Sequence, residues 1–192
     1  MAIPKLKTDK FTYADYLTWN DDKRWEIIDG YIYDMNTSPK RKHQSISGNL
    51  SVLFSNFLKV KKCKVYIAPF DVCLCEKNES DEEIENVVQP DISIFCDTSK
   101  LNDNGAKGSP DLIIEILSES TYKKDLGVKL ILYQKYAVKE YWLVDPNTDS
   151  LTVYKLDLFG RYQIEKEYTK NEKVIVGIFP ELKININELF EE

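Results

Sequence analysis

The strongest hydrophobic pattern in this chain lies in residues 42–59. Its apolar residues recur at intervals of three and four, the spacing of an amphipathic helix: Ile46, Leu50, Leu53, Phe54, Phe57 and Leu58. Residues 122–138 carry a second helical pattern, and 118–121 before it supply capping residues. A short helix is also predicted over 12–19, with Thr12 as its N-cap.

Strand patterns fill most of the remaining chain. Two short runs around Asp29 and Gly30 predict a hairpin. Further strands are predicted over 64–68, 71–75, 87–96, 111–117 and 140–145, and the tail beyond them is also rich in strands. Pro90 interrupts the strand 87–96, which is tolerated at a sheet edge or a bulge. The run 111–117 is nearly all apolar, which is typical of a strand buried on both faces.

This order of elements predicts a mixed α/β fold in a single domain, residues 1–192, with enough apolar residues (43%) for a sizeable core. No apolar run approaches the roughly 20 residues needed to cross a bilayer. The N-terminus shows no secretory signal. The four cysteines form no CxxC pair, so we expect no structural zinc, four reduced thiols and a cytoplasmic location.

The net charge of −6 argues at first against a nucleic-acid partner. Six acids and one lysine lie together in residues 76–85, however, and the rest of the chain carries a net charge of only −1. That segment is typical of a solvated loop. Charge alone therefore neither supports nor excludes a polyanionic partner.

Two acids in predicted strands are the most informative residues. Glu115 interrupts the apolar run 111–117, and Asp91 follows Pro90 inside the predicted strand 87–96. Each has a structural explanation: a buried ion pair for Glu115, and a bulge residue that caps its own backbone for Asp91. On neighbouring strands, the two would instead lie side by side and share a hard cation. Oxygen-only ligands favour Mg²⁺ or Mn²⁺ over zinc.

A lysine is the third candidate group. Asp125, Lys129 and Tyr133 share one face of the predicted helix 122–138, and Lys129 lies between apolar neighbours. A cation near two acids and a metal helps to position and activate an attacking water. The alternative is an ordinary ion pair between Lys129 and Asp125, four residues apart.

These residues together resemble a known nuclease family. A Pro-Asp in one strand, a Glu in the next and a helix behind them are similar to the PD-(D/E)XK nuclease superfamily. The motifs WEIIDG, QPDISIF, GSPDLIIEILSES and VKEYWLVDP, in this order, resemble the Uma2 family (DUF820) of restriction-endonuclease-like proteins. The resemblance covers roughly residues 12–154.

The resemblance implies an αβββαβ core over about 12–154, an N-terminal hairpin and a β-rich extension over 155–192. Asp91 and Glu115 fall on the family's metal-binding carboxylates, and Glu26 falls on the Glu of its hairpin motif, as a third acid of the site. Leu117 stands where the superfamily has its strand lysine, and Lys129 of the next helix takes that role. The alternative for Glu26 is an exposed hairpin residue.

The function implied is Mg²⁺- or Mn²⁺-dependent hydrolysis of DNA phosphodiester bonds, with no membrane association. Cutting both strands favours a homodimer, because one site cuts one strand at a time. Arg41, Lys42 and His43 begin the helix 42–59, and helix N-termini favour anions, so these three are candidate substrate contacts. The alternative function is an inactive nuclease fold that binds DNA or another protein.

Overall fold

The computed structural model describes residues 10–21, 23–35 and 38–191, and two mixed sheets form its centre. Sheet B has six strands, in the spatial order β12 (Tyr162–Tyr168), β11 (Ser150–Leu156), β10 (Glu140–Asp145), β9 (Leu112–Ile116), β6 (Ile92–Phe95) and β3 (Lys64–Ile67). Sheet A has the order β2 (Tyr31–Asp34), β1 (Trp25–Ile28), β5 (Val87–Val88), β4 (Val72–Cys73), β8 (Gly105–Lys107) and β7 (Leu101–Asn102). The expected mixed α/β fold is confirmed.

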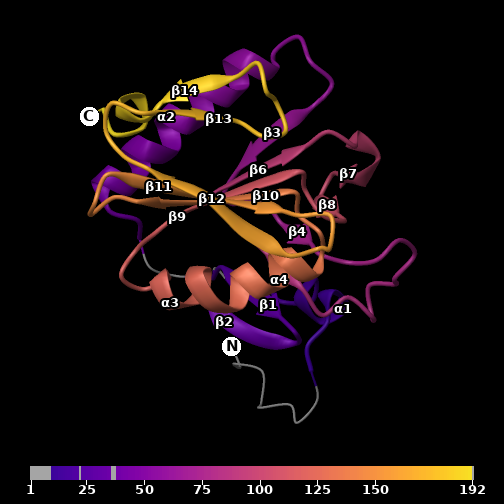
Figure 1. Ribbon diagram of the computed structural model, residues 1–192. Helices are drawn as coiled ribbons and strands as arrows, with labels where there is room; N and C mark the ends of the chain where they lie inside the picture. The colour runs from indigo at the N-terminus through magenta and orange to yellow at the C-terminus, as the bar shows by residue number, and fades with distance from the viewer. Residues whose placement is uncertain (1–9, 22, 36–37, 192) are drawn as a thin grey trace.

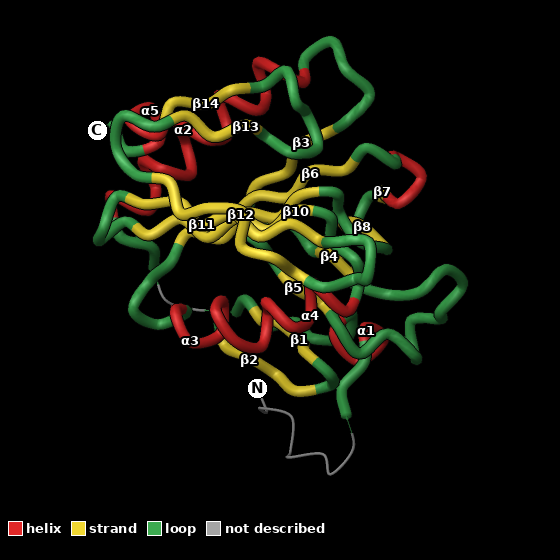
Figure 2. The backbone as a smooth tube through the Cα atoms, viewed as in Figure 1, coloured by secondary structure: helices red, strands yellow, loops and turns green. Residues whose placement is uncertain are grey.

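Helices cover both faces of sheet B (Figure 1). On one face lies α2 (Arg41–Leu58), with β13 (Lys173–Ile175), β14 (Lys183–Asn185) and α5 (Ile186–Leu189) around it. On the other face lies a helical stretch made of α3 (Tyr122–Lys124), the π-helical segment η2 (Asp125–Lys129) and α4 (Leu130–Lys135) (Figure 2). Two shorter helices are α1 (Tyr13–Tyr16) and the 3-10 turn η1 (Thr98–Lys100). Among the described residues, no helix is long and apolar enough to span a membrane.

The predicted nuclease core is present in the expected order. It consists of α2, the strands β3, β6 and β9, the helical stretch α3–α4, and β10. β9 is central and completely buried, as its apolar run predicts, because β6 pairs with it on one side and β10 on the other. The apolar face of α2 packs on this sheet through Ile46, Leu50 and Phe54. The hairpin β1–β2 and the N-cap of α1 at Thr12 also match the sequence pattern.

The chain crosses between the two sheets where one strand, interrupted at Pro90, was predicted. β5 belongs to sheet A and β6 to sheet B, and Gln89, Pro90 and Asp91 form the corner between them. The prediction of a single strand over 87–96 is therefore wrong, and Asp91 precedes a strand rather than lying inside one. Proline lacks the N–H that a continuous ladder would need, which explains why the strand breaks here.

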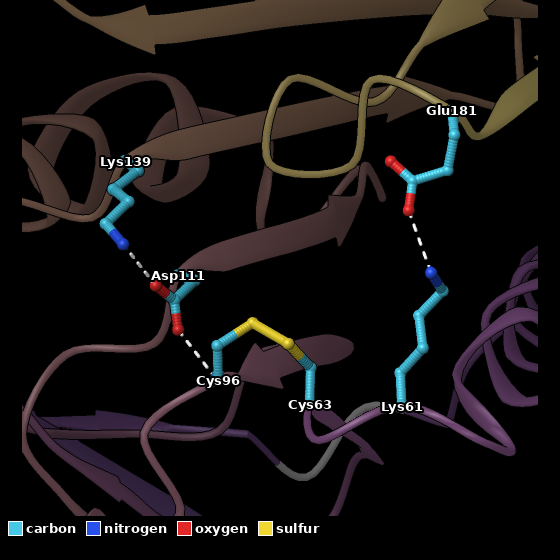
Figure 3. Close-up of a disulfide and its surroundings, with 6 residues drawn as sticks. All are labelled: Lys61, Cys63, Cys96, Asp111, Lys139 and Glu181. Carbon is cyan, nitrogen blue, oxygen red and sulfur yellow. Dashed lines mark hydrogen bonds and ion pairs between the residues drawn. A yellow bond between two sulfur atoms is a disulfide. The ribbon is translucent and has the colours of Figure 1, made fainter.

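Two of the four thiols are joined. Cys63 and Cys96 form a disulfide between the start of β3 and the end of β6, with their Cα atoms 4.0 Å apart (Figure 3). They are the next antiparallel pair after Lys64 and Phe95. The expectation of four reduced thiols is wrong for this pair, whereas Cys73 and Cys75 are free. Spacing along the chain could not show it, because a separation of 33 positions between the two cysteines gives no hint of strand register.

Candidate functional site

The two predicted metal-binding acids converge where β6 begins and β9 ends. Ile92 pairs with Ile114 across these antiparallel strands, so Asp91 and Glu115 are the next residues in register. The Asp91 N–H donates to Glu115 Oε2 (3.3 Å), and the Ile116 N–H donates to Asp91 Oδ2 (2.7 Å). The structure thus brings the two carboxylates together, as their place on predicted neighbouring strands suggested.

Lys129 reaches the same place from η2. Its side chain is only 1% exposed, and Nζ lies 2.8 Å from Glu115 Oε1 and 2.8 Å from Glu26 Oε1. The distance from Nζ to Asp125 Oδ1 is 3.9 Å, so the simple intrahelical pair is the weakest of its contacts. The π-helical turn that carries both Asp125 and Lys129 is a rare conformation, and such turns occur frequently at functional sites.

Glu26 is fully buried, which excludes an exposed hairpin position. Its Oε1 accepts from the Gln89 N–H (2.9 Å) and contacts Lys129, and its Oε2 contacts Lys124 Nζ (2.6 Å). Both oxygens are therefore engaged by other groups of the protein. The place of Glu26 is behind Lys129, where it holds the ammonium rather than facing the open pocket.

Burial and charge set the protonation of this cluster. Burial alone would raise the pKa of Glu26, but Lys129 and Lys124 outweigh it and lower the pKa to about 2. At Glu115, burial dominates and raises the pKa to about 8. Burial would lower the pKa of Lys129, yet the carboxylates of Glu115 and Glu26 raise it well above its ordinary value. Lys129 is thus charged at neutral pH.

Two further groups contact the acids. Tyr133 donates its hydroxyl hydrogen to Glu115 Oε1 (2.7 Å). His43 Nε2 lies 3.3 Å from Asp91 Oδ2, and His43 Nδ1 is buried without a hydrogen-bond partner. Asp125 Oδ1 is likewise buried and lacks a hydrogen-bond partner. The site therefore contains unsatisfied polar atoms on both the helix α2 side and the η2 side.

These residues surround a pocket of about 340 Å³ between the N-terminus of α2, the β5–β6 corner and η2. Asp91, Glu115 and Lys129 all line it, and so do His43, Asp125 and Arg24. Among the described residues, Arg41 and Lys42 are not part of its lining. Lys42 instead contacts Asp149 (2.6 Å) and the Pro146 carbonyl. Of the three predicted substrate contacts, only His43 faces the pocket.

Sequence reasoning missed four residues of this site: Lys124, Tyr133, Arg24 and Gln89. Tyr133 shares the predicted helix face of Asp125 and Lys129, and this was the available signal. The π-helical turn begins directly after Lys124, and the Lys124 ammonium contacts Glu26. Arg24 and Gln89 carried no signal, because their roles depend on how sheets A and B meet.

Comparison with known proteins identifies the family of this chain. The Uma2 family, whose description reads "Putative restriction endonuclease", matches residues 13–187 of the chain. The chain belongs to the Uma2 family. Membership points to a nuclease, a hydrolase of phosphodiester bonds, as the general class of function.

Two similar proteins extend the comparison. The Uma2 chain is 29% identical over 154 residues to the uncharacterized protein slr1290 of Synechocystis sp., which covers 79% of this chain and 77% of that protein. It also resembles the crystal structure of a "putative nuclease belonging to DUF820" from Anabaena variabilis, with a TM-score of 0.74 and 21% sequence identity, over 94% of this chain and 97% of that one. At this identity the likeness shows the fold.

The donor set of this Uma2 protein fits a hard divalent cation. Asp91, Glu115 and Asp125 all line the pocket, and Asp125 Oδ1 is buried without a hydrogen-bond partner. No group of three or more His, Cys, Asp or Glu side chains among the described residues could hold a metal. Mg²⁺ needs only one or two carboxylates because it retains water ligands, whereas structural zinc needs four protein ligands.

Proposed function

We propose that this Uma2 protein is a metal-dependent endonuclease that hydrolyses DNA phosphodiester bonds. One observation carries the proposal: Asp91, Glu115 and Lys129 come from three separate elements and meet in one pocket. A structural ion pair would need neither the pocket nor the second carboxylate. Asp91 and Glu115 would hold Mg²⁺ or Mn²⁺, which would supply Lewis-acid stabilisation of the charge that develops on the scissile phosphate.

The other residues of the site would contact the substrate or position the residues that do. Lys129 has three N–H donors, of which two are used by Glu26 and Glu115, so the third is available to a water or a phosphate oxygen in the pocket. Glu26 keeps that ammonium charged and in place. Tyr133 orients the Glu115 carboxylate, and His43 orients that of Asp91 while it faces the substrate. Glu26 and Tyr133 act through other residues and are positioning residues.

A plasmid-nicking assay tests this proposal. The protein is incubated with supercoiled DNA and Mg²⁺ or Mn²⁺, beside the variants Asp91→Ala and Glu115→Ala. We expect cleavage by the wild type and its loss in both variants. Asp111→Asn is the matched control, because Asp111 directly precedes β9 but lies outside the pocket lining. Equal cleavage by wild type and both pocket variants, or none with either metal, would overturn the proposal.

A nucleic-acid- or protein-binding module without turnover is the second candidate. The observation that favours it is the occupancy of Glu115, whose Oε1 accepts from Lys129 and Tyr133 and whose Oε2 accepts from the Asp91 N–H. Titration calorimetry with Mn²⁺ separates the two candidates. A nuclease binds the ion at a site that Glu115→Ala removes, whereas a binding module retains affinity for DNA and takes up no ion in the pocket.

We further propose a two-fold homodimer. A single pocket of this kind cuts one strand, and cutting both strands of a duplex needs two pockets related by symmetry. Sedimentation equilibrium at micromolar concentration, with and without a duplex oligonucleotide, measures the assembly. A strict monomer under both conditions, together with double-strand cleavage, would contradict the dimer.

A further inference from the structure

Asp125 is an acid of the pocket whose hydrogen bonding is incomplete. It begins the π-helical turn η2, where its N–H donates to the Thr121 carbonyl (2.9 Å) and its carbonyl accepts from the Tyr141 hydroxyl (3.1 Å). The side chain lines the pocket and is only 3% exposed, yet Oδ1 lacks a hydrogen-bond partner. No other carboxylate oxygen among the described residues is both buried and unpartnered. Nearly all buried polar atoms are hydrogen-bonded, so we expect this oxygen to find its partner in the pocket.

The ammonium beside Asp125 does not supply that hydrogen bond. Lys129 Nζ lies 3.9 Å from Asp125 Oδ1, which is too long for a hydrogen bond, whereas it lies 2.8 Å from Glu115 Oε1 and from Glu26 Oε1. Those two carboxylates use two of its three N–H donors. Lys129 and Asp125 both line the pocket. One water can therefore bridge them, accepting from the ammonium and donating to the carboxylate.

The arrangement around Glu115 favours a water over the metal ion as the partner of Asp125. Glu115 Oε1 accepts from Lys129, whereas Oε2 accepts from the Asp91 N–H, so Lys129 and Asp91 meet this carboxylate at different oxygens. Asp125 is beside the ammonium, which repels a divalent cation. No three acidic, histidine or cysteine side chains in the described part of the chain are grouped to hold one ion.

We propose that Asp125 accepts the proton of the attacking water, which Lys129 and Asp125 hold between them. This inference rests on the proposed endonuclease function and deepens it by naming the residue that takes the proton. A lone pair of the water oxygen forms the new bond to phosphorus, while one O–H bond breaks and its proton passes to Asp125 Oδ1. The bond from phosphorus to the leaving sugar oxygen breaks, and its electron pair stays on that oxygen, which solvent protonates. Asp125 then releases its proton to solvent, so one water is consumed for each phosphodiester bond cut.

Burial makes Asp125 a better proton acceptor than Lys129. It raises the pKa of the Asp125 carboxyl above its usual range, although Lys129 acts in the opposite direction. A general base is most effective when its pKa approaches the working pH. Burial would lower the pKa of Lys129, but Glu115 and Glu26 raise it well above its ordinary value. The ammonium therefore keeps its proton and has no lone pair to accept another.

Single-turnover cleavage of supercoiled DNA with Mg²⁺ tests this step. Asp125→Asn keeps the shape of the side chain and removes the proton acceptor, so the cleavage rate constant should fall about 100-fold. Two affinities should stay unchanged: that for Mn²⁺, measured by titration calorimetry, and that for a fluorescein-labelled DNA oligonucleotide, measured by anisotropy in EDTA. Asp111→Asn is the matched control, because it makes the same substitution at a buried acid outside the pocket lining, and it should cleave like the wild type.

Chemical rescue separates a proton acceptor from a structural carboxylate. Asp125→Ala leaves a space in the pocket wall that formate can enter, and formate supplies the missing carboxylate oxygen. Sodium formate should therefore raise the cleavage rate of Asp125→Ala in proportion to its concentration, whereas sodium chloride at the same ionic strength should not. Thermal unfolding checks that both variants are folded, and Asp125→Ala serves if Asp125→Asn is not.

The outcomes are distinguishable. Cleavage by Asp125→Asn at the wild-type rate, an equal loss in Asp111→Asn, or an equal effect of formate and chloride overturns the role of Asp125 while the wild type still cleaves. A loss of Mn²⁺ affinity in Asp125→Asn also overturns it, because the residue would then be a metal ligand. A wild type that cleaves no DNA with either metal removes the proposed function itself, and the proton transfer with it.

Discussion

β9 has an acid at each end, and the two have nearly the same contacts in different surroundings. Asp111 accepts from the Cys96 N–H (2.7 Å) and from Lys139 (2.6 Å), as Figure 3 shows. Glu115 accepts from the Asp91 N–H and from Lys129. In both cases a backbone N–H from the β6 side and a lysine satisfy one buried carboxylate. The side chain of Lys139 is 67% exposed, however, whereas that of Lys129 is 1% exposed.

This comparison shows that the number of contacts does not decide what an ion pair contributes. Lys139 keeps its hydration, so its pair with Asp111 costs little to form and little to lose. Lys129 has been removed from water together with its acids, so each charge depends on the others. At the end of β9 with the exposed lysine, the ion pair has a structural role only. The end with the buried lysine lines the pocket at which we propose a metal ion.

Lys129→Ala is expected to give the largest effect. It leaves Glu26 and Glu115 buried without their shared partner, and breaking such a pair costs about 3–5 kcal/mol in the free energy of unfolding. Urea denaturation measures it. The matched variant Lys139→Ala should cost less than about 1 kcal/mol, because its pair is solvated. Similar losses in the two variants would mean that burial does not distinguish the two ends of β9.

The pH dependence of stability is expected to be the next largest effect. In metal-free protein the pKa of Glu115 is about 8, above its unfolded value of 4.5. Between these pH values the folded state binds more protons than the unfolded state, so the free energy of unfolding falls as pH rises, by at most about 1.4 kcal/mol per pH unit from one group. The raised pKa of His43, for which the Asp91 contact outweighs burial, acts in the same direction.

Urea denaturation in EDTA between pH 5 and pH 8 measures this slope. Glu115→Gln should flatten most of it, and the remainder belongs to His43 and to Asp125 and Glu140, whose pKa values burial raises. A slope that persists unchanged in Glu115→Gln would show that Glu115 is ionised throughout this range.

Lys124 offers an intermediate case. Its side chain is 12% exposed, and Nζ contacts Glu26 Oε2 at 2.6 Å. Lys124→Ala should cost about 2 kcal/mol, because Glu26 then keeps Lys129 but loses the partner of its second oxygen. Urea denaturation of the alanine variants of Lys129, Lys124 and Lys139 under one set of conditions measures the three losses in the free energy of unfolding. We expect the loss to decrease in that order, as the exposure of the lysine increases. Any other order of the three losses contradicts the dependence on exposure.

Tyr133→Phe should give the smallest effect. It removes one neutral hydrogen bond to Glu115 Oε1 while Lys129 remains, a loss of about 1 kcal/mol. The same unfolding measurements quantify it. Tyr162→Phe is a control outside the acid cluster, since that hydroxyl donates to the Val138 carbonyl. A loss as large as that of Lys129→Ala would show that Tyr133, rather than the lysine, stabilises the buried carboxylate.

The sequence predicted local structure and the pairing of acids well. Helical spacing identified α2 and the stretch α3–α4, and an acid within an apolar run identified Glu115. Contacts between residues that lie far apart in the sequence were harder to predict. The corner at Gln89–Asp91 was predicted only as an interruption at Pro90, because the pattern on either side looks the same whether it belongs to one sheet or to two. The burial of Glu26 and the Cys63–Cys96 disulfide depend on strand register, which no local pattern encodes.

The corner between β5 and β6 also acts as a spacer. The N–H of residue 89 donates to Glu26, and the N–H of residue 91 donates to Glu115. These carboxylates flank Lys129 and belong to different sheets, so the separation of the two sheets at the site is set by the length of a single tripeptide. Adding or removing one residue there would shift one acid against the other by more than an ion pair tolerates. In this protein the length of one loop is therefore as strict a requirement as the identity of any side chain in the pocket.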